Sequence, residues 1–242
     1  MAARVFLLIA VLATRPLVAA AADSFSATDG DRSGQDRHFL WKAKSPNGAV
    51  VYLLGSIHAL PEDDYPLAAQ IEEAFDSAHT VFFEVDMENT SAMGRQLLSA
   101  GALPQERLLD DILDPETKRL VDAHLEASGL SFGAIEAMKP WMAALTLTSI
   151  ELMKAGFSPD AGLDIHLARR AREQGKAIGA FETAEYQIGL FSAMDEDAGR
   201  AFLRYTLKDI DAVGPQLDVL TDAWKNGDIE VITALLTEAF SE

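Results

Sequence analysis

Two short apolar runs between residues 38 and 54 indicate two strands. Residues 38–44 and 49–54 are apolar runs of strand length, and "SPNG", which lies between them, is rich in turn formers. This pattern predicts a β-hairpin whose second strand ends at Gly55. His58 follows three residues later, in the segment "GSIH".

A helical pattern follows the hairpin. After Pro66, apolar residues recur at helical spacing and predict one apolar face, made of Leu67, Ile71, Ala74, Phe75 and Ala78. Residues 80–86, "TVFFEVD", form a nearly continuous apolar run, which is typical of a buried strand in a parallel sheet. A strand, a helix and a strand within about thirty residues predict a right-handed βαβ unit.

Most of the remaining chain has helical patterns with clear start and stop signals. Asp114 and Pro115 are typical of a helix start, and Gly129 of a helix end. We expect further helices at 140–156 and 162–174, a third strand of the parallel sheet at 176–181, and helices after Thr183 with breaks near residues 195, 214 and 227. The expected fold is α/β: a mixed central β-sheet with an N-terminal hairpin, flanked by helices, with a large helical insertion and a helical C-terminal segment.

The first 22 residues have the organisation of a secretory signal peptide. Arg4 precedes the short apolar run "VFLLIAVLA", and the alanines at 20–22 offer a cleavage site before Asp23. Residues 23–37 are small and polar and are expected to form a flexible lead-in. A single α/β domain is expected over residues 38–242. The sequence therefore predicts a periplasmic or secreted protein, and no later apolar stretch is long enough to give the mature chain a membrane span.

Composition excludes several classes of function. The formal charge of −18 at pH 7 would repel a phosphate backbone, so nucleic acid is not an expected partner. The chain has no cysteine, which excludes disulfides and cysteine nucleophiles. The motifs of serine hydrolases, P-loop proteins, dinucleotide-binding proteins and H-E-x-x-H metalloproteases are also missing from the sequence.

Three polar residues stand at corresponding places near the ends of the expected strands. His58 follows the hairpin, Glu84 lies near the end of residues 80–86, and Glu182 follows residues 176–181. Ligands of open α/β sheets bind outside the carboxyl ends of parallel strands. If the three strands are neighbours, one imidazole and two carboxylates converge on one crevice. Glu84 is flanked by apolar residues, and a buried carboxylate there requires a hydrogen-bond partner, a counter-charge or a metal.

Each candidate also has an ordinary structural explanation. Glu84 could face solvent, His58 could bond a nearby backbone group, and Gly55 could serve a turn with positive φ. Asp164 lies in the first turn of an expected helix, where the helix dipole favours a negative charge in any protein. His166 is two residues further on and is expected on another side of that helix.

Other titratable residues are expected to have surface roles. The acidic residues 62–64 could add oxygen ligands near His58, although a solvated acidic loop is the preferred interpretation. The remaining histidines are expected at the surface, two of them on helices (His79, His124) and one near the start of the hairpin (His38). Arg169 and Arg170 are expected to solvate their helix.

Four segments taken together resemble the TraB/GumN (TraB/PrgY/GumN) family: "YLLGSIHALP", "FFEVD", "GLDIHLARRAREQGKAIGAFET" and "YQIGLF". Their order and spacing are similar to that family from residue 38 to the end of the chain. The family includes the Tiki proteases, which are metal-dependent peptidases with G-x-x-H motifs. The wider group resembles the erythromycin-esterase and ChaN-like proteins, which implies a mixed α/β core.

The resemblance implies roles for individual residues. Gly55 and His58 correspond to the first G-x-x-H motif of the family, Glu84 to its strand-end glutamate, and Glu182 to the glutamate of the "ET" segment. Asp164 matches the acidic position after the family's glycine and would support the site, as would Gly55. His58 and Glu84 would be metal ligands or the water-activating base, with Glu182 assisting catalysis. Nitrogen and oxygen ligands suit Mn, Co, Zn or Fe.

The sequence departs from the family pattern towards its C-terminus. The resemblance implies a second G-x-x-H motif there, but no other glycine in the 242 residues is followed three positions later by histidine. We therefore expect a C-terminally incomplete domain or a variant, with weak or no activity. An incomplete fragment without independent function is one hypothesis that follows.

The leading hypothesis is an exported, metal-dependent hydrolase of the peptidase kind, acting on a peptide or small-molecule ligand. The alternative is a non-catalytic protein that sequesters a peptide or small ligand, or binds haem or iron. One histidine with few further ligands would suit binding better than turnover. The pattern favours no particular oligomeric state.

Overall fold

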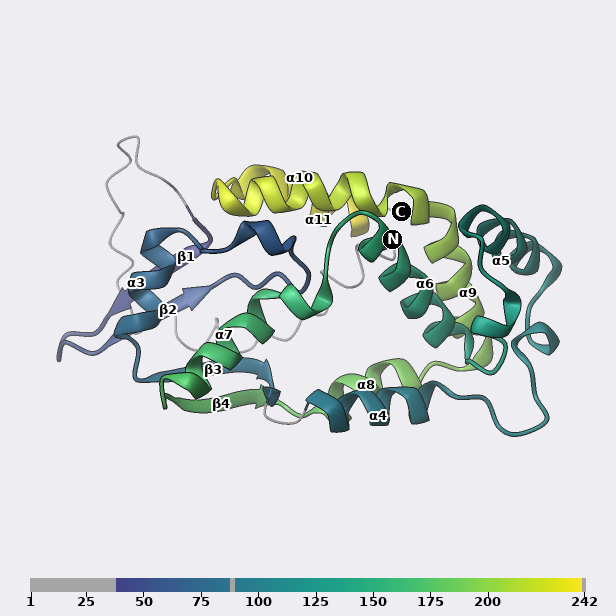
Figure 1. The fold of residues 1–242 in the computed structure, drawn as a ribbon, viewed down its shortest axis with the longest axis horizontal. Helices are drawn as coiled ribbons and strands as arrows, with labels where there is room; N and C mark the ends of the chain where they lie inside the picture. Colours follow the sequence, from purple (N-terminus) through teal and green to yellow (C-terminus); the bar gives the residue numbers. More distant parts are fainter. Residues whose placement is uncertain (1–37, 88–89, 241–242) are drawn as a thin grey trace. The chain divides into compact units, whose positions relative to one another are not determined.

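The computed structural model describes residues 38–87 and 90–240 (Figure 1). These residues divide into two compact units. The first, called here the GSIH unit because it contains that segment, comprises residues 38–81, 158–178 and 215–240. The second, called the helical unit, comprises residues 82–157 and 179–214. The expected signal peptide and lead-in, residues 1–37, lie outside the described residues.

The expected α/β class is confirmed, with small sheets of antiparallel and parallel strands. β1 (Leu40–Lys44) and β2 (Val50–Leu54) form the predicted hairpin, with Leu40 opposite Leu54 in an antiparallel register. Gly48 has a φ of 88° in the connecting turn, a conformation that glycine adopts without strain. β3 (Thr80–Val85) is hydrogen-bonded to β4 (Ala177–Glu182).

The strand pairing differs from the expected βαβ unit. In the described part of the chain, β2 pairs with β1 and β3 pairs with β4, so the strands form two two-stranded sheets instead of one central sheet. The exposure of β2 gives the physical reason, because Val50, Val51 and Leu53 are all exposed. A strand inside a parallel sheet buries both of its faces, whereas a hairpin strand does not need to.

Helices of the GSIH unit follow the apolar periodicity. α3 (Ala69–Ser77) buries Ile71, Ala74 and Phe75, three members of the predicted face. α7 (Leu163–Glu173) is held to α3 by Arg170, which pairs with Glu72 and lies 4.6 Å from the centroid of the Phe75 ring. The expectation that Arg170 only solvates its helix was therefore wrong. Four further elements belong to this unit: the 3₁₀ turns η1 (Glu62–Asp64) and η5 (Pro159–Ala161) and the helices α10 (Val213–Lys225) and α11 (Ile229–Phe240). The first two residues of α10 are assigned to the helical unit.

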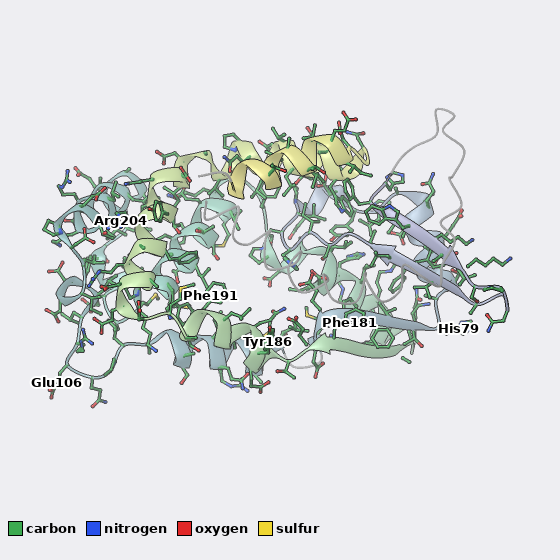
Figure 2. All side chains as sticks on the ribbon, turned by 180° about the vertical axis from the view of Figure 1, so that it is seen from behind. His79, Glu106, Phe181, Tyr186, Phe191 and Arg204 are labelled. Carbon is green, nitrogen blue, oxygen red and sulfur yellow. The ribbon has the colours of Figure 1, made fainter. Side chains whose placement is uncertain are left out.

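The helical unit contains the predicted helical insertion. Asp114 caps the start of α5 by accepting hydrogen bonds from the N–H groups of Glu116 and Thr117, as the sequence predicts. α6 lies against α9, and Trp141 of α6 also stacks on Phe191 of α8 with ring centroids 5.7 Å apart. Phe191 is labelled in Figure 2. The helices of this unit are α4 (Thr90–Gly101), α5 (Pro115–Ser128), α6 (Pro140–Lys154), α8 (Ala184–Ser192) and α9 (Glu196–Asp209), with 3₁₀ turns η3 (Leu109–Asp111), η4 (Phe132–Ala134) and η6 (Ile210–Ala212). Within residues 38–87 and 90–240, no helix is long and apolar enough to cross a membrane.

Three histidines lie apart from the GSIH segment. His124 is buried on α5, not exposed as expected, and its burial lowers its pKa below the ordinary value. His79 is exposed but lies in the connection between α3 and β3, not on a helix (Figure 2). His38 is half-buried, and its Nδ1 lies 2.9 Å from the carbonyl oxygen of Lys225.

Candidate functional site

The GSIH segment leaves β2 through a tightly packed glycine. The N–H of Gly55 donates to the carbonyl oxygen of Phe39 (2.8 Å), and a Cβ at residue 55 would lie 3.2 Å from the Cβ of Phe39. Gly55 is not among the residues with positive φ. Its role here is thus close approach to Phe39, and the alternative of a left-handed turn was wrong.

The backbone of the segment is held from two sides. Trp224 on α10 donates its indole N–H to the carbonyl oxygen of Gly55 (2.8 Å). On the other side, the N–H of Leu163 donates to the carbonyl oxygen of Ile57 (2.9 Å), and Gly162 lies directly against the carbonyl group of His58. Because buried backbone groups must be paired, these contacts set the path of residues 55–58.

His58 and Asp164 meet through a short hydrogen bond. The Nδ1 atom of His58 lies 2.6 Å from Oδ2 of Asp164, and their side chains are 37% and 17% exposed. An ionised carboxylate accepts hydrogen bonds only, so the proton in this contact belongs to Nδ1. In the neutral ring, Nε2 is then the unprotonated nitrogen, the atom through which an imidazole accepts a proton or binds a metal.

Ser56 donates a second hydrogen bond to the same carboxylate oxygen. Its Oγ lies 2.7 Å from Oδ2 of Asp164. The serine therefore anchors Asp164 to the GSIH segment, and its hydroxyl bonds the carboxylate and not the imidazole. Two donors on one oxygen fix the orientation of the Asp164 carboxylate in this partly buried position.

Tyr65 and His166 form a stacked pair in the same unit. Their ring centroids are 3.9 Å apart and the rings are inclined by 20°. The Tyr65 hydroxyl donates to the carbonyl oxygen of Ala161 (2.7 Å). Burial, followed by the negative charges of Asp164 and Asp64, raises the pKa of Tyr65 to about 12. Burial and the nearby cations Arg170 and Arg169 lower the pKa of His166, so both rings are uncharged near neutral pH.

The acidic residues after His58 are only partly the solvated loop that the sequence favoured. Glu62 and Asp63 are exposed, as expected. The Asp64 side chain is 13% exposed and pairs with Lys225 of α10, which also accepts the His38 contact through its carbonyl oxygen. Asp64 is therefore a structural link between η1 and α10.

Glu84 and Glu182 belong to the helical unit. Both are half-buried, on the hydrogen-bonded neighbours β3 and β4, so two of the three strands considered as neighbours from the sequence do pair. Glu182 accepts a hydrogen bond of 3.2 Å from the amide of Gln187, one turn into α8. Within the GSIH unit, the predicted residues Gly55, His58 and Asp164 are brought together; Glu84 and Glu182 are placed in the other unit.

In the GSIH unit, His58 is the side chain best oriented to bind a metal. A carboxylate that fixes a histidine through Nδ1 is the usual arrangement behind a metal-binding Nε2, and His58 with Asp164 fits it. In the described residues, no group of three or more histidine, aspartate or glutamate side chains is placed to hold an ion. The arrangement therefore orients one ligand or base and does not by itself form a complete metal centre.

Sequence reasoning missed several residues that shape this site. Ser56 lies inside the motif, but nothing in the pattern indicated its bond to Asp164. Trp224 is 169 residues from its partner Gly55, and no local signal connects them. His166 was expected on another side of its helix from Asp164 and matched no motif; its stacking partner Tyr65 lies in a loop that the periodicity does not describe.

Comparisons with known proteins agree with the resemblance carried by the motifs. The model of the TraB/PrgY/gumN family matches residues 39–242. The uncharacterized protein YbaP of Escherichia coli strain K12 is 24% identical over 208 residues, which cover 85% of this chain and 76% of YbaP; YbaP of Shigella flexneri has the same identity and coverage. No solved structure matches the chain. Because the family model covers far more than half of the sequence, the chain belongs to the TraB/PrgY/gumN family.

Proposed function

We propose that this protein is a metal-dependent hydrolase of the peptidase kind, that it acts on a peptide or small-molecule ligand, and that His58 is its central residue. One observation carries the proposal: the hydrogen bond of 2.6 Å between Nδ1 of His58 and Oδ2 of Asp164. The bond holds the ring in one orientation and leaves Nε2 as its basic nitrogen.

The half-exposed position of His58 supports a role in chemistry. At 37% exposure its side chain is accessible to a ligand, while Asp164 behind it is 17% exposed and shielded. A carboxylate behind an imidazole increases the basicity of the ring and stabilises its protonated form. The pair can therefore accept a proton from water or present a nitrogen to a divalent ion.

The proposed metal ligand in the GSIH unit is His58, whereas Glu84 and Glu182 remain separate candidates in the helical unit. A bound Mn, Co, Zn or Fe ion would lower the pKa of water and polarise the substrate carbonyl. His58 would hold its ring against Asp164, and Ser56 would hold Asp164 in place through the bond of 2.7 Å. Gly55 contributes by allowing the segment to pass close to Phe39.

Metal titration of the full chain tests this proposal. We expect stoichiometric binding of at least one of these ions by calorimetry, no binding by His58→Ala, and affinity reduced by about 10–100-fold in Asp164→Asn. His79→Ala removes an exposed histidine elsewhere and should bind as the wild type does. We expect cleavage of a peptide library to be weak or absent, and any cleavage to require the same ion and to be lost in His58→Ala.

The opposite results are equally clear. Equal metal affinity of the wild type and a folded His58→Ala variant would overturn the role of His58. Mass spectrometry that finds a ligand retained by the purified protein, together with no cleavage, would favour the non-catalytic binding protein instead.

We also propose that residues 1–22 direct export. The expected result is a mature protein that begins at Asp23 and is found in the periplasmic or secreted fraction. N-terminal mass spectrometry of the fractionated protein checks this, and a product that begins at Met1 and remains in the cytoplasm would contradict it.

A further inference from the structure

Tyr65 contacts the chain on both sides of Asp164. Its hydroxyl donates to the carbonyl oxygen of Ala161, and its ring stacks on His166 with centroids 3.9 Å apart. Asp164 lies between these two contacts in the sequence, in the first turn of α7. The Tyr65 side chain thus contacts both the residues that precede α7 and the first turn of that helix.

The carboxylate of Asp164 also acts electrostatically on the phenol of Tyr65. Asp164 and Asp64 both raise the pKa of the phenol, after the larger effect of burial. The phenol therefore remains protonated and continues to donate to Ala161 across the physiological range. His166, whose pKa is lowered chiefly by burial, stacks as an uncharged ring.

The orientation of Asp164 has a chemical consequence. Its Oδ2 atom must lie in the direction of the Nδ1–H bond of His58 for the contact of 2.6 Å to persist. Gly162, the N-cap residue of α7, makes no side-chain capping hydrogen bond. Besides the hydrogen bond from the N–H of Leu163 to Ile57, the contacts of Tyr65 with Ala161 and His166 restrain this first turn.

We propose that Tyr65, stacked on His166, is a positioning residue that keeps Asp164 aligned with His58 and so keeps the imidazole proton on Nδ1. Tyr65 acts through Asp164 and does not touch the reacting atoms. The importance of this alignment for activity rests on the proposed function, whereas the alignment itself does not.

The tautomer of His58 is the direct readout. Two-bond ¹H–¹⁵N correlation spectra of the full-length chain with ¹⁵N-labelled histidine identify which ring nitrogen carries the proton. The spectra are recorded with chelator and without substrate at about pH 8, well above the ordinary histidine pKa of about 6.5. His58→Gln assigns the signal.

The tyrosine variants separate the two contacts. Tyr65→Phe keeps the stack on His166 and removes only the hydrogen bond to Ala161, and we expect the ratio of Nδ1–H to Nε2–H at His58 to fall by about threefold or more. Tyr65→Leu removes the stack as well, and the ratio should fall further. Tyr186→Phe, at an exposed tyrosine of α8 that is labelled in Figure 2, should leave the ratio unchanged.

An unchanged His58 tautomer in Tyr65→Phe and Tyr65→Leu would overturn the proposal. Should Tyr65→Leu fail to fold, the Tyr65→Phe result decides alone, because that change keeps the ring. The tautomer is measured without metal, so a protein that binds no metal and cleaves nothing can still support the role of Tyr65. Conversely, if the protein proves to be a metal-dependent hydrolase but the His58 tautomer is the same in the Tyr65 variants, the proposed function stands and the role of Tyr65 is refuted.

Discussion

Gly162 shapes the candidate site by having no side chain. A Cβ at this position would lie 2.8 Å from the carbonyl carbon of His58 and 3.0 Å from the carbonyl oxygen of Pro159. Both neighbours are backbone, which cannot rotate away. The close approach lets α7 begin beside the GSIH segment, where Asp164 reaches His58.

Gly162→Ala should therefore destabilise the protein although alanine is the better helix former. We expect the free energy of unfolding to fall by about 1–3 kcal/mol, because the added methyl group forces the backbone apart. Urea unfolding measures this. Gly94→Ala in α4 is the matched control, since no atom lies within 4 Å of its added methyl group, and it should raise stability by about 0.5–1 kcal/mol. Equal stability of Gly162→Ala and the wild type would show that the backbone around residue 162 moves apart at no cost in free energy, and would contradict this prediction.

At the scale of elements, α10 and the end of β2 act as one structural joint. Trp224 donates to the carbonyl oxygen of Gly55, and the next residue, Lys225, pairs with Asp64 of η1. The indole is buried, so its N–H needs a partner and the carbonyl oxygen of Gly55 supplies it. The GSIH segment is therefore held by α10 at Gly55, in addition to its contacts with the start of α7.

Trp224→Phe tests the joint. The phenyl ring retains most of the apolar surface, but the hydrogen bond to Gly55 is lost and a carbonyl group is left unpaired. We expect a loss of about 1–3 kcal/mol in the free energy of unfolding, measured in urea. Trp41→Phe on β1 changes an indole that is 45% exposed and should shift stability by no more than about 0.5 kcal/mol. A smaller effect at Trp224 than at Trp41 would argue against the joint.

At the scale of the whole molecule, two histidines whose pKa is lowered by burial give stability a specific dependence on pH. Burial lowers the pKa of both His124 and His166 in the folded state. In the unfolded chain each would titrate near the ordinary value of about 6.5. The unfolded state therefore takes up protons at a higher pH than the folded state does, and acidification through this range favours unfolding.

The free energy of unfolding should accordingly fall between about pH 7.5 and pH 5.5, a window that lies above the ordinary carboxylate range. Urea unfolding at several pH values gives the slope. His124→Gln should reduce the slope, whereas His79→Gln, at an exposed histidine, should retain most of it. Identical slopes for the wild type and His124→Gln would mean that His124 does not contribute.

Much of the local structure could be predicted from the sequence. Asp114, Pro115 and Gly129 delimit α5 as their chemistry requires, and Gly48 occupies the hairpin turn. The apolar face of α3 follows from its periodicity. These features depend on interactions between residues a few positions apart, which a single sequence displays directly.

Pairings between distant segments could not be predicted in the same way. The apolar pattern of residues 50–54 fits a buried parallel strand and an exposed hairpin strand equally well, and only the partner β1 decides between them. His124 has the same local sequence whether it faces solvent or lies buried, as it does on α5. Periodicity reports which face of an element is apolar, but it does not report what covers that face.

By itself, the sequence determined the α/β class, the hairpin, the helix ends and the family motifs that single out His58, Glu84 and Glu182. Only the tertiary structure decided that Asp164 is the partner of His58 across 106 residues, and that Trp224 and Gly162 hold the backbone between them. The physical reason is the short range of hydrogen bonding. A bond of 2.6 Å forms only after folding has brought His58 and Asp164 together, and that approach depends on how the elements between them pack.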